Sequence, residues 1–339
     1  MKILALLMQH DYGIKERGFS YEYLNIFLPL CDVYGKENIF LYDYFSDYKS
    51  KGKKFCNNRI LEIVNEIKPD LSVFCLFKNE IEFETVDKLR KISPAFCYFI
   101  DDPWRVKFAR QWIKHFDFFS TPDFFMHQTY IAEGFTNALY SPFGFNSSIY
   151  KKKDLKKIYD VTFVGGFSPY RKWVINLLQK EGIKINVFGR GWSSDNNWIS
   201  QEQMIDIFNQ SKINLNLSNA VFYDLKFLFY SFSSPYSIAK ILRLKKFREQ
   251  IKGRHYEING CGGFQLSYYV QGLNLAYEIE KEIAVFDNVY NLPETINFYL
   301  KNDKLREQIA ENGFQKSLKE HTAQSYLKNL VEQIRSRIK

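Results

Sequence analysis

The sequence predicts an α/β protein with two successive domains, each a parallel sheet covered by helices on both faces. Three observations support this prediction. The chain has 339 residues, which exceeds one typical core of about 100–150 residues and suits two domains. Short apolar runs typical of buried strands alternate with segments of helical periodicity. A polar, basic stretch at residues 146–154 interrupts the alternation and is typical of a linker.

The first domain is expected over residues 1–150. Residues 2–9 form an apolar run that breaks into a polar loop before a helical pattern begins at Ser20. The same alternation then repeats, with strands expected at 38–44, 71–77, 95–100, 117–120 and 138–141 and helices at 59–67, 86–92 and 124–133. Strands that alternate with helices in this way form a parallel sheet.

The second domain is expected over residues 151–325, followed by a terminal helix at 326–339. We expect strands at 159–164, 185–188, 213–217, 263–268 and 282–286, and helices at 170–179, 201–209, 293–301, 303–312 and 322–338. The alternation fails at about 221–248, an aromatic and basic segment that looks inserted. Two such domains joined by one linker place a cleft between the carboxyl ends of the sheets, where ligands bind in such folds.

Charge and composition narrow the class of ligand. The chain carries 47 Lys and Arg against 38 Asp and Glu, a formal charge of +9, which favours an anionic partner such as a nucleotide diphosphate, nucleic acid or acidic lipid. Its 5 cysteines are widely spaced without a Cys-x-x-Cys pair, which favours reduced thiols and argues against a zinc site. No apolar stretch suits a signal peptide or a membrane span, so we expect a cytoplasmic protein. Aromatic residues make up 18% of the chain, an excess over what its cores need.

Two glycine loops follow predicted strands of the second domain. Gly165 and Gly166 stand between a strand and a helix, where backbone N–H groups and the helix N-terminus can approach a phosphate and Arg171 can add a full positive charge. Gly189 repeats the arrangement after the next strand. A tight strand-to-helix turn also needs glycine for conformational reasons alone.

The most informative segment is residues 250–264. Lys252 and Arg254 can neutralise a diphosphate, and Glu257 at a helix start can accept hydrogen bonds from the two hydroxyls of a ribose. Gly262 and Gly263 follow, directly before a predicted strand. The alternative interpretation is a capped short helix with a surface ion pair.

This segment resembles the nucleotide-sugar-binding core of glycosyltransferases with the GT-B fold, in particular group-1-like enzymes related to spore-maturation glycosyltransferases. Those proteins carry a Lys-x-Arg-x-Phe/Tyr-Glu-x-x-x-Cys-Gly run, which matches Lys252 to Gly262. Residues 272–288, 293–310 and 320–322 continue the resemblance, and residues 161–171 look like the first strand and phosphate loop of the same domain. It covers about residues 158–330 well, and the first half only through residues 17–22 and 100–104.

The resemblance implies two Rossmann-like domains facing across a cleft, a nucleotide-sugar donor in the second domain and an acceptor in the first. A UDP-sugar is the donor expected, with no cofactor and no metal. Many retaining relatives carry two glutamates spaced Glu-x7-Glu, and Glu249 stands eight residues before Glu257. Because acidic residues are common in this chain and Gly253 interrupts a single helix, retention and inversion of the anomeric centre both stay open.

The first domain offers candidates for the acceptor side. Arg17 and Gly18 lie in the loop after the first strand and can meet the donor phosphates. An inverting transfer needs a base for the acceptor hydroxyl proton, and Asp102, Asp101 and His10 are the candidates. The aspartates can equally cap a helix that begins near Pro103.

Three other functions remain open at this stage. Basic charge with interleaved aromatic residues suits nucleic-acid binding or modification of a hydroxylated DNA base. The segment at 221–248 can instead contact a membrane surface and reach a lipid-linked acceptor. A sugar-nucleotide epimerase has the same architecture. A glycan, a lipid-linked hydroxyl and a nucleic-acid base all remain as acceptors, and we expect the aromatic insert to decide among them.

Overall fold

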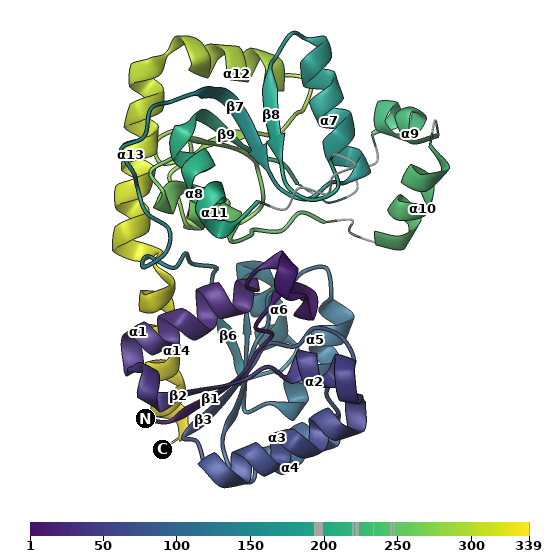
Figure 1. The fold of residues 1–339 in the computed structure, drawn as a ribbon, viewed down its shortest axis with the longest axis vertical. Coiled ribbons are helices and arrows are strands. Elements are labelled where there is room, and N and C mark those ends of the chain that lie inside the picture. The colour runs from purple at the N-terminus through teal and green to yellow at the C-terminus, as the bar shows by residue number, and fades with distance from the viewer. Residues whose placement is uncertain are drawn as a thin grey trace. The chain divides into compact units, whose positions relative to one another are not determined.

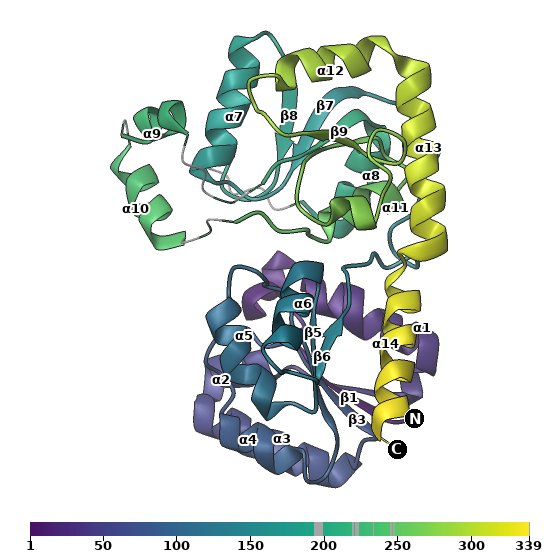
Figure 2. The same cartoon turned by 180° about the vertical axis from the view of Figure 1, so that it is seen from behind.

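The structure is a computed structural model that describes residues 1–192, 199–218, 220, 224–232, 234–244, 246 and 248–338. The chain forms two compact units. Unit 1 contains Met1–Ser148 and Thr322–Lys339, and unit 2 contains Ile149–His321 (Figures 1 and 2). The fold class predicted from the sequence is confirmed, because each unit is built on an all-parallel sheet covered by helices.

Unit 1 has a six-stranded parallel sheet in the order β2-β1-β3-β4-β5-β6. Its strands are β1 (Ile3–Leu6), β2 (Ile39–Tyr42), β3 (Leu71–Phe74), β4 (Ala95–Tyr98), β5 (Phe118–Thr121) and β6 (Ala138–Tyr140). The central strand β1 pairs with β2 on one side and β3 on the other, so Ile3 lies beside both Ile39 and Leu71. The strand order therefore reverses between β1 and β3, which is the switch point where α/β sheets bind ligands.

Helices cover both faces of this sheet. The helices of unit 1 are the π-helical turn η3 (Tyr23–Phe27), α1 (Leu28–Tyr34), α2 (Tyr44–Lys51), α3 (Lys53–Ile67), α4 (Phe83–Leu89), α5 (Val106–Trp112), α6 (Phe124–Ala132) and α14 (Ala323–Ile338). Alternate residues of β1 point to opposite faces, so Leu4 packs in a core with Val64 of α3 and Val86 of α4. Ile3 packs on the other side with Leu30 of α1 and Val331 of α14.

The C-terminal helix α14 thus completes a core that begins with the first strand. Leu327, Leu330, Val331 and Ile334 are buried at helical spacing against that core. At its start, Thr322 forms a β-bridge with Phe145, and the Gln324 Nε2 amide donates to Asn146 Oδ1 at 2.8 Å. Unit 1 therefore depends on residues from both ends of the chain.

Unit 2 has a five-stranded parallel sheet in the order β11-β10-β9-β7-β8. Its strands are β7 (Tyr159–Val164), β8 (Ile185–Phe188), β9 (Ser211–Asn216), β10 (Gln265–Tyr268) and β11 (Ala284–Phe286). Its α-helices are α7 (Pro169–Lys180), α8 (Gln201–Gln210), α9 (Leu225–Phe232), α10 (Pro235–Leu244), α11 (Arg254–Gly260), α12 (Leu292–Lys301) and α13 (Asp303–Glu320). The order reverses between β7 and β9, which defines the switch point of this sheet.

Local sequence explains where the helices of unit 2 begin. Ser168 caps α7 by accepting from the Arg171 N–H at 3.2 Å, and Pro169 occupies the first turn, where its missing N–H costs nothing. Ser200 and Gln203 form a reciprocal capping box at α8. The segment that breaks the alternation forms the two helices α9 and α10, which lie side by side next to α7 (Figures 1 and 2).

One helix of unit 1, α2, was not predicted from the sequence, and α5 was considered only as an alternative. The strand expected at 38–44 ends at Tyr42, and α2 begins at Tyr44 after Asp43 caps it. Only Tyr44 and Phe45 of α2 are buried, so its sequence carries little helical periodicity. The short helix α5 follows the Asp102-Pro103 dipeptide and buries only Ala109 and Trp112.

Replacing Ile334 by alanine tests the role of α14 in unit 1. Ile334 is fully buried, so Ile334→Ala should lower the free energy of unfolding of unit 1 by about 2–5 kcal/mol. Ile338→Ala is the matched control, because Ile338 is exposed and its loss should change stability by less than about 0.5 kcal/mol. Hydrogen exchange should show lower protection in β1 and β3 while β7 and β9 stay unchanged. Loss of protection in unit 2 alone would contradict this arrangement.

Candidate functional site

Three loops converge at the carboxyl ends of β7, β8 and β9 in unit 2. They are residues 165–168, 189–192 and 217–218, and the first and third flank the switch point of the sheet. Such a position in an open α/β sheet is the expected place of a ligand site.

Arg171, on the first turn of α7, ties the two flanking loops together. Its Nε and Nη2 donate to the Leu217 carbonyl at 3.1 and 2.8 Å, and its Nη1 donates to the Gly166 carbonyl at 2.8 Å. Burial lowers the pKa of this guanidinium to about 10. Backbone carbonyls on both sides of the switch point thus accept from this guanidinium, and its predicted contact with a phosphate stays a prediction.

The first glycine loop is packed against the second. The Gly165 N–H donates to the Phe188 carbonyl at 2.9 Å, and the Trp192 indole N–H donates to the Gly165 carbonyl at 2.7 Å. At Gly189, whose φ is +119°, a Cβ atom would lie 2.6 Å from the Gly165 oxygen. The Gly165 N–H therefore extends the sheet, and the place of this residue beside a phosphate stays a prediction. A Cβ at Gly166 would meet no atom within 4 Å, so that residue faces open space.

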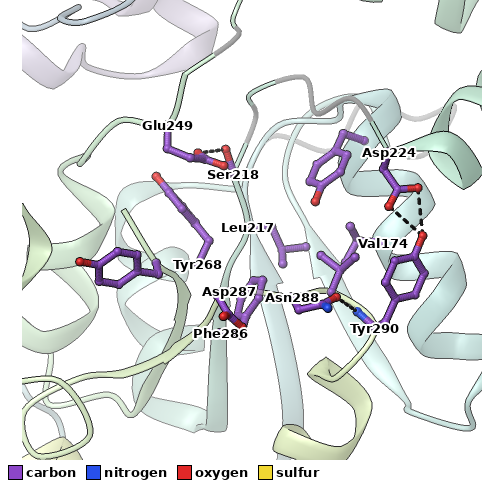
Figure 3. A pocket seen from close by; sticks show the side chains of 13 residues that line it. Val174, Leu217, Ser218, Asp224, Glu249, Tyr268, Phe286, Asp287, Asn288 and Tyr290 are labelled. Atoms are coloured by element: carbon purple, nitrogen blue, oxygen red, sulfur yellow. Dashed lines mark hydrogen bonds between the residues drawn. The ribbon is translucent and has the colours of Figure 1, made fainter. Parts of the chain in front are cut away.

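A pocket of about 480 Å³ opens at this edge of the sheet (Figure 3). Its walls come from α7, from the ends of β9, β10 and β11, and from the start of α9. It is lined by Tyr170, Val174, Leu217, Ser218, Asp224, Glu249, Tyr268, Tyr269, Phe286, Asp287, Asn288, Val289 and Tyr290. Carboxylates, hydroxyls and aromatic rings together are the surface that a polyhydroxylated, ring-containing ligand needs.

Glu249 is a carboxylate of this pocket whose pKa lies near neutrality. Its Oε2 accepts a hydrogen bond from the Ser218 hydroxyl, as Figure 3 shows. Burial raises the pKa of Glu249 to about 7, while the Ser218 hydrogen bond and the positive charges of Lys252 and Arg171 act in the opposite direction. Glu249 can therefore exchange a proton near neutral pH, and Lys252 is the half-buried cation beside it.

Asp224 connects the pocket to the two inserted helices. The Tyr290 hydroxyl donates to both oxygens of Asp224 at 2.9 and 2.8 Å, and the Lys226 ammonium lies 4.5 Å from the Tyr290 ring centroid. On the opposite wall, the Tyr268 hydroxyl donates to the Gln250 carbonyl at 2.6 Å. The side chains that line the pocket are thus held in place by contacts with their neighbours.

Glu257 and Arg254 lie on the first turn of α11. Glu257 is buried, where its Oε2 lies 2.8 Å from Arg254 Nη1 and its Oε1 accepts from the Tyr150 hydroxyl at 2.7 Å. The Arg254 guanidinium also lies 5.1 Å from the Phe208 ring centroid on α8. The two side chains thus anchor α11 to the interior of unit 2, and their predicted contacts with ribose and phosphate stay a prediction.

Gly262 and Gly263 lie at the other edge of the sheet. They directly precede β10, so they stand at its amino end, whereas ligands bind at the carboxyl end. A Cβ at Gly263 would lie 2.8 Å from Asn214 Nδ2, and one at Gly262 would lie 2.8 Å from the Lys152 side chain. Both glycines are therefore needed for close packing, and their role in donor binding stays a prediction.

In unit 1, the loop after β1 holds three of the predicted residues. Arg17 lies 3.6 Å from the Asp11 carboxylate and over the Tyr12 ring at 5.3 Å. Gly18 has a φ of +80°, and its carbonyl accepts from the Asp11 N–H at 3.1 Å. The His10 ring stacks on Phe19 with 5.4 Å between centroids. These contacts shape the loop, and no described residue of unit 2 is part of them.

The two aspartates differ sharply in exposure. Asp101 is half-buried and pairs with Arg105 at 2.9 Å. Asp102 is 0% exposed, accepts from the Tyr130 hydroxyl at 2.9 and 3.0 Å, and has a pKa raised to about 7 by burial. Its carboxylate exposes no surface, which favours a structural role, and the predicted role of Asp102 as a base stays a prediction.

Glu22 is a carboxylate that the sequence-based argument did not select. It lies on the first turn of the helix after β1, and its Oε1 accepts from the thiol of Cys75, which directly follows β3, at 3.8 Å. It therefore stands at the switch point of unit 1. Burial raises its pKa to about 7, and the nearby charges of Asp101 and Asp11 add to that shift.

The residues that sequence reasoning missed could have been found because they lie close to the carboxyl ends of strands. Ser218 and Cys75 stand within two residues of β9 and β3, and Tyr268 ends β10. The sequence indicates Glu249 only through its Glu-x7-Glu spacing to Glu257. Within the described ranges, no group of three His, Cys, Asp or Glu side chains is arranged as a metal site.

Comparisons with known proteins agree with this geometry. Residues 171–332 match the model of a family described as glycosyl transferase-like. No curated protein sequence matches the chain significantly. The matched segment begins at Arg171 and contains the residues that line the pocket except Tyr170.

Solved structures share the fold across the whole chain. Anabaena Alr3699/HepE in complex with UDP-glucose aligns with a TM-score of 0.65 at 10% identity, over 99% of this chain and 100% of that chain. A glycosyltransferase from Rickettsia africae ESF-5 aligns with a TM-score of 0.60 at 12% identity, over 100% and 98%. A Listeria monocytogenes protein assigned provisionally as a UDP-N-acetylglucosamine 2-epimerase aligns with 0.55 at 10% identity, over 93% of each chain.

The family match and the fold agree on the class of protein, a glycosyltransferase with the GT-B fold. The resemblance predicted from the sequence is thereby confirmed at the level of that class. The narrower link to spore-maturation enzymes stays a prediction. No helix among the described residues is long and apolar enough to cross a bilayer.

Replacing Asp102 by asparagine separates a structural from a catalytic role. Because its pKa is raised from 3.8 to about 7 in the folded protein, the wild type should lose stability as pH rises from 4 to 7. The Asp102→Asn variant has no carboxyl group there and does not lose stability in this way. Its free energy of unfolding, relative to that of the wild type, should therefore increase by up to about 4 kcal/mol between pH 4 and pH 8. Urea unfolding at both pH values measures the difference. A fall in turnover of about 100-fold or more would instead support the catalytic role.

Proposed function

We propose that the protein transfers a sugar from a nucleotide-diphosphate sugar, a UDP-sugar, to an acceptor hydroxyl, and that it does so without a resident metal ion. The observation that carries this proposal is the pocket at the carboxyl edge of unit 2, which lies almost entirely within the segment matched by the glycosyltransferase model. The structures of Anabaena Alr3699/HepE in complex with UDP, glucose and UDP-glucose support a donor of this kind.

The diphosphate in this proposal lies at the N-terminus of α7. The helix dipole, the open backbone at Gly166 and the Lys252 ammonium then share its negative charge. This arrangement lets the protein stabilise the leaving diphosphate where a metal ion would otherwise do so. The arrangement therefore supports a transfer reaction that needs no metal ion. If so, addition of EDTA should leave turnover unchanged.

The sugar and nucleoside in this proposal occupy the pocket. Asp224, Asp287 and Glu249 can accept hydrogen bonds from hydroxyl groups, and the Tyr268 and Tyr269 rings can pack against the ring faces. At neutral pH, Glu249 is near its pKa, so it can either accept or donate such a hydrogen bond.

We propose that Glu22 of unit 1 is the general base that accepts the proton of the acceptor hydroxyl. A base that works near neutral pH needs a pKa close to 7, and Glu22 combines that pKa with a place at the switch point of its sheet. Asp101, by contrast, is paired with Arg105, and Asp102 is enclosed. This assignment belongs to an inverting reaction, in which the acceptor oxygen attacks as the proton leaves.

The likeness to the Listeria protein favours a second candidate function, epimerisation of a nucleotide sugar. The two reactions differ in what they need. An epimerase converts the nucleotide sugar with no acceptor present, whereas a transferase releases UDP at a rate that depends on an acceptor. Incubation with UDP-sugars alone therefore distinguishes them.

Replacing Lys252 by alanine tests the donor site. Loss of a charge-assisted contact to the diphosphate should raise the Kd for UDP by about 10- to 100-fold, as measured by calorimetry. Lys304→Ala is the matched control, because Lys304 is exposed on α13 and should not change the Kd. Equal UDP affinity in the Lys252→Ala variant and the wild type would contradict the proposed position of the diphosphate, and no binding of any nucleotide would reject the function.

Replacing Glu22 by glutamine tests the base. A base must be deprotonated, so wild-type kcat/KM should rise about tenfold per pH unit below a pKa of about 7 and then level off. Glu22→Gln should lose at least about 100-fold in turnover and should lose this rise. Glu249→Gln is the necessary comparison, since Glu249 titrates in the same range. If the rise persists in Glu22→Gln and disappears in Glu249→Gln, the assignment is wrong.

A further inference from the structure

The inserted helix α9 is fixed to unit 2 by one of its faces. Phe227 is fully buried, and its ring centroid lies 5.3 Å from that of Tyr170 and 5.6 Å from that of Trp173 on α7. The Asn176 side-chain amide of α7 donates to the Tyr230 hydroxyl at 3.1 Å. The orientation of α9 is therefore set by packing against α7, and its other face is presented outward.

That outward face is strongly apolar. Leu225, Phe229 and Phe232 are 72%, 74% and 69% exposed, the highest values among the exposed large hydrophobic residues of the described chain. Their spacing of four and three residues places them on one side of a helix. Isolated apolar side chains are common on protein surfaces, but three neighbouring large ones indicate an interaction surface.

The same segment is the most basic insertion in the fold. Residues 221–248 contain six Lys and Arg, at positions 226, 240, 243, 245, 246 and 248, against the single acid Asp224. Asp224 itself is engaged by Tyr290. An apolar helix face accompanied by a cluster of cations is the pattern that binds at the interface of an acidic membrane.

We propose that the α9–α10 hairpin docks on a membrane surface that contains acidic phospholipids, with Leu225, Phe229 and Phe232 inserted among the acyl chains. The described cations Lys226, Lys246 and Arg248 then add attraction to the anionic headgroups. Nucleic acid is the weaker partner for this surface, because base stacking needs planar rings along a groove, whereas here an aliphatic leucine and two phenylalanines form one convex helix face.

Docking also has a consequence for the pocket of unit 2. Asp224, one residue before α9, lines that pocket, so the inserted helix begins at the pocket wall. A membrane that binds α9 is then held beside the pocket of the same unit. The docking step needs no catalysis, so it stands or falls independently of the proposed transfer reaction.

Co-sedimentation of the full-length protein with vesicles tests the proposal. Binding is expected to phosphatidylcholine vesicles that contain about 30% phosphatidylglycerol and to be weaker by about tenfold or more on pure phosphatidylcholine. The double variant F229S/F232S should lose about tenfold or more in vesicle affinity while its circular dichroism spectrum and thermal unfolding stay unchanged, which shows that unit 2 remains folded. Phe298→Ser is the matched control, since Phe298 is an exposed phenylalanine on α12 outside the hairpin.

The outcomes that overturn the proposal are distinct. Absence of binding to phosphatidylglycerol vesicles at low salt would reject it, and so would binding that F229S/F232S leaves unchanged. Salt-sensitive binding of single-stranded DNA or RNA that F229S/F232S abolishes, without vesicle binding, would replace the membrane by nucleic acid as the partner.

Discussion

The organisation of unit 2 depends on one buried cation that joins the two sides of its sheet at the switch point. Arg171 donates to carbonyls of the loop after β7 and of the loop after β9, which are neighbours in the sheet but distant in the sequence. Carbonyls that follow the end of a strand need donors, and a guanidinium supplies several in a fixed plane. With these loops fixed, Ser218 can hold Glu249, and the pocket between β9, β10 and α7 keeps its shape.

Burial gives three carboxyl groups similar pKa values, but the three groups differ in their access to a ligand. Glu249, Glu22 and Asp102 each have a pKa raised to about 7 by desolvation. Asp102 is fully enclosed under Tyr130, so its protonation affects only stability. Glu249 lines a pocket, and Glu22 stands at the switch point of unit 1 beside Cys75, so protonation of either can affect a ligand. A shifted pKa therefore indicates a functional group only when the carboxylate can reach a ligand.

The sequence predicted most of the fold because the periodicity of apolar residues identifies strands and helices. The strand expected at 159–164 matches β7 in full, and the helix expected at 322–338 matches α14 to within a residue. The prediction failed for α2, because only Tyr44 and Phe45 of its eight residues face the core. For the site, residue type and spacing selected Glu257 and Arg254 as ligand-binding candidates, but their ion pair is buried and its surroundings depend on α8 and Tyr150, which lie far away in the sequence.

The sequence by itself determined the class of this protein: two α/β halves, glycine loops after strands, a motif typical of GT-B glycosyltransferases, and a basic aromatic insert. Tertiary structure alone decided which polar groups form hydrogen bonds within the protein and which line a pocket. Gly165, Arg171 and Glu257 find partners within the protein, whereas Glu249, although it accepts from Ser218, also lines a pocket. The physical reason is that hydrogen-bond partners and burial are set by segments far apart in the chain, and no local pattern of residues encodes them.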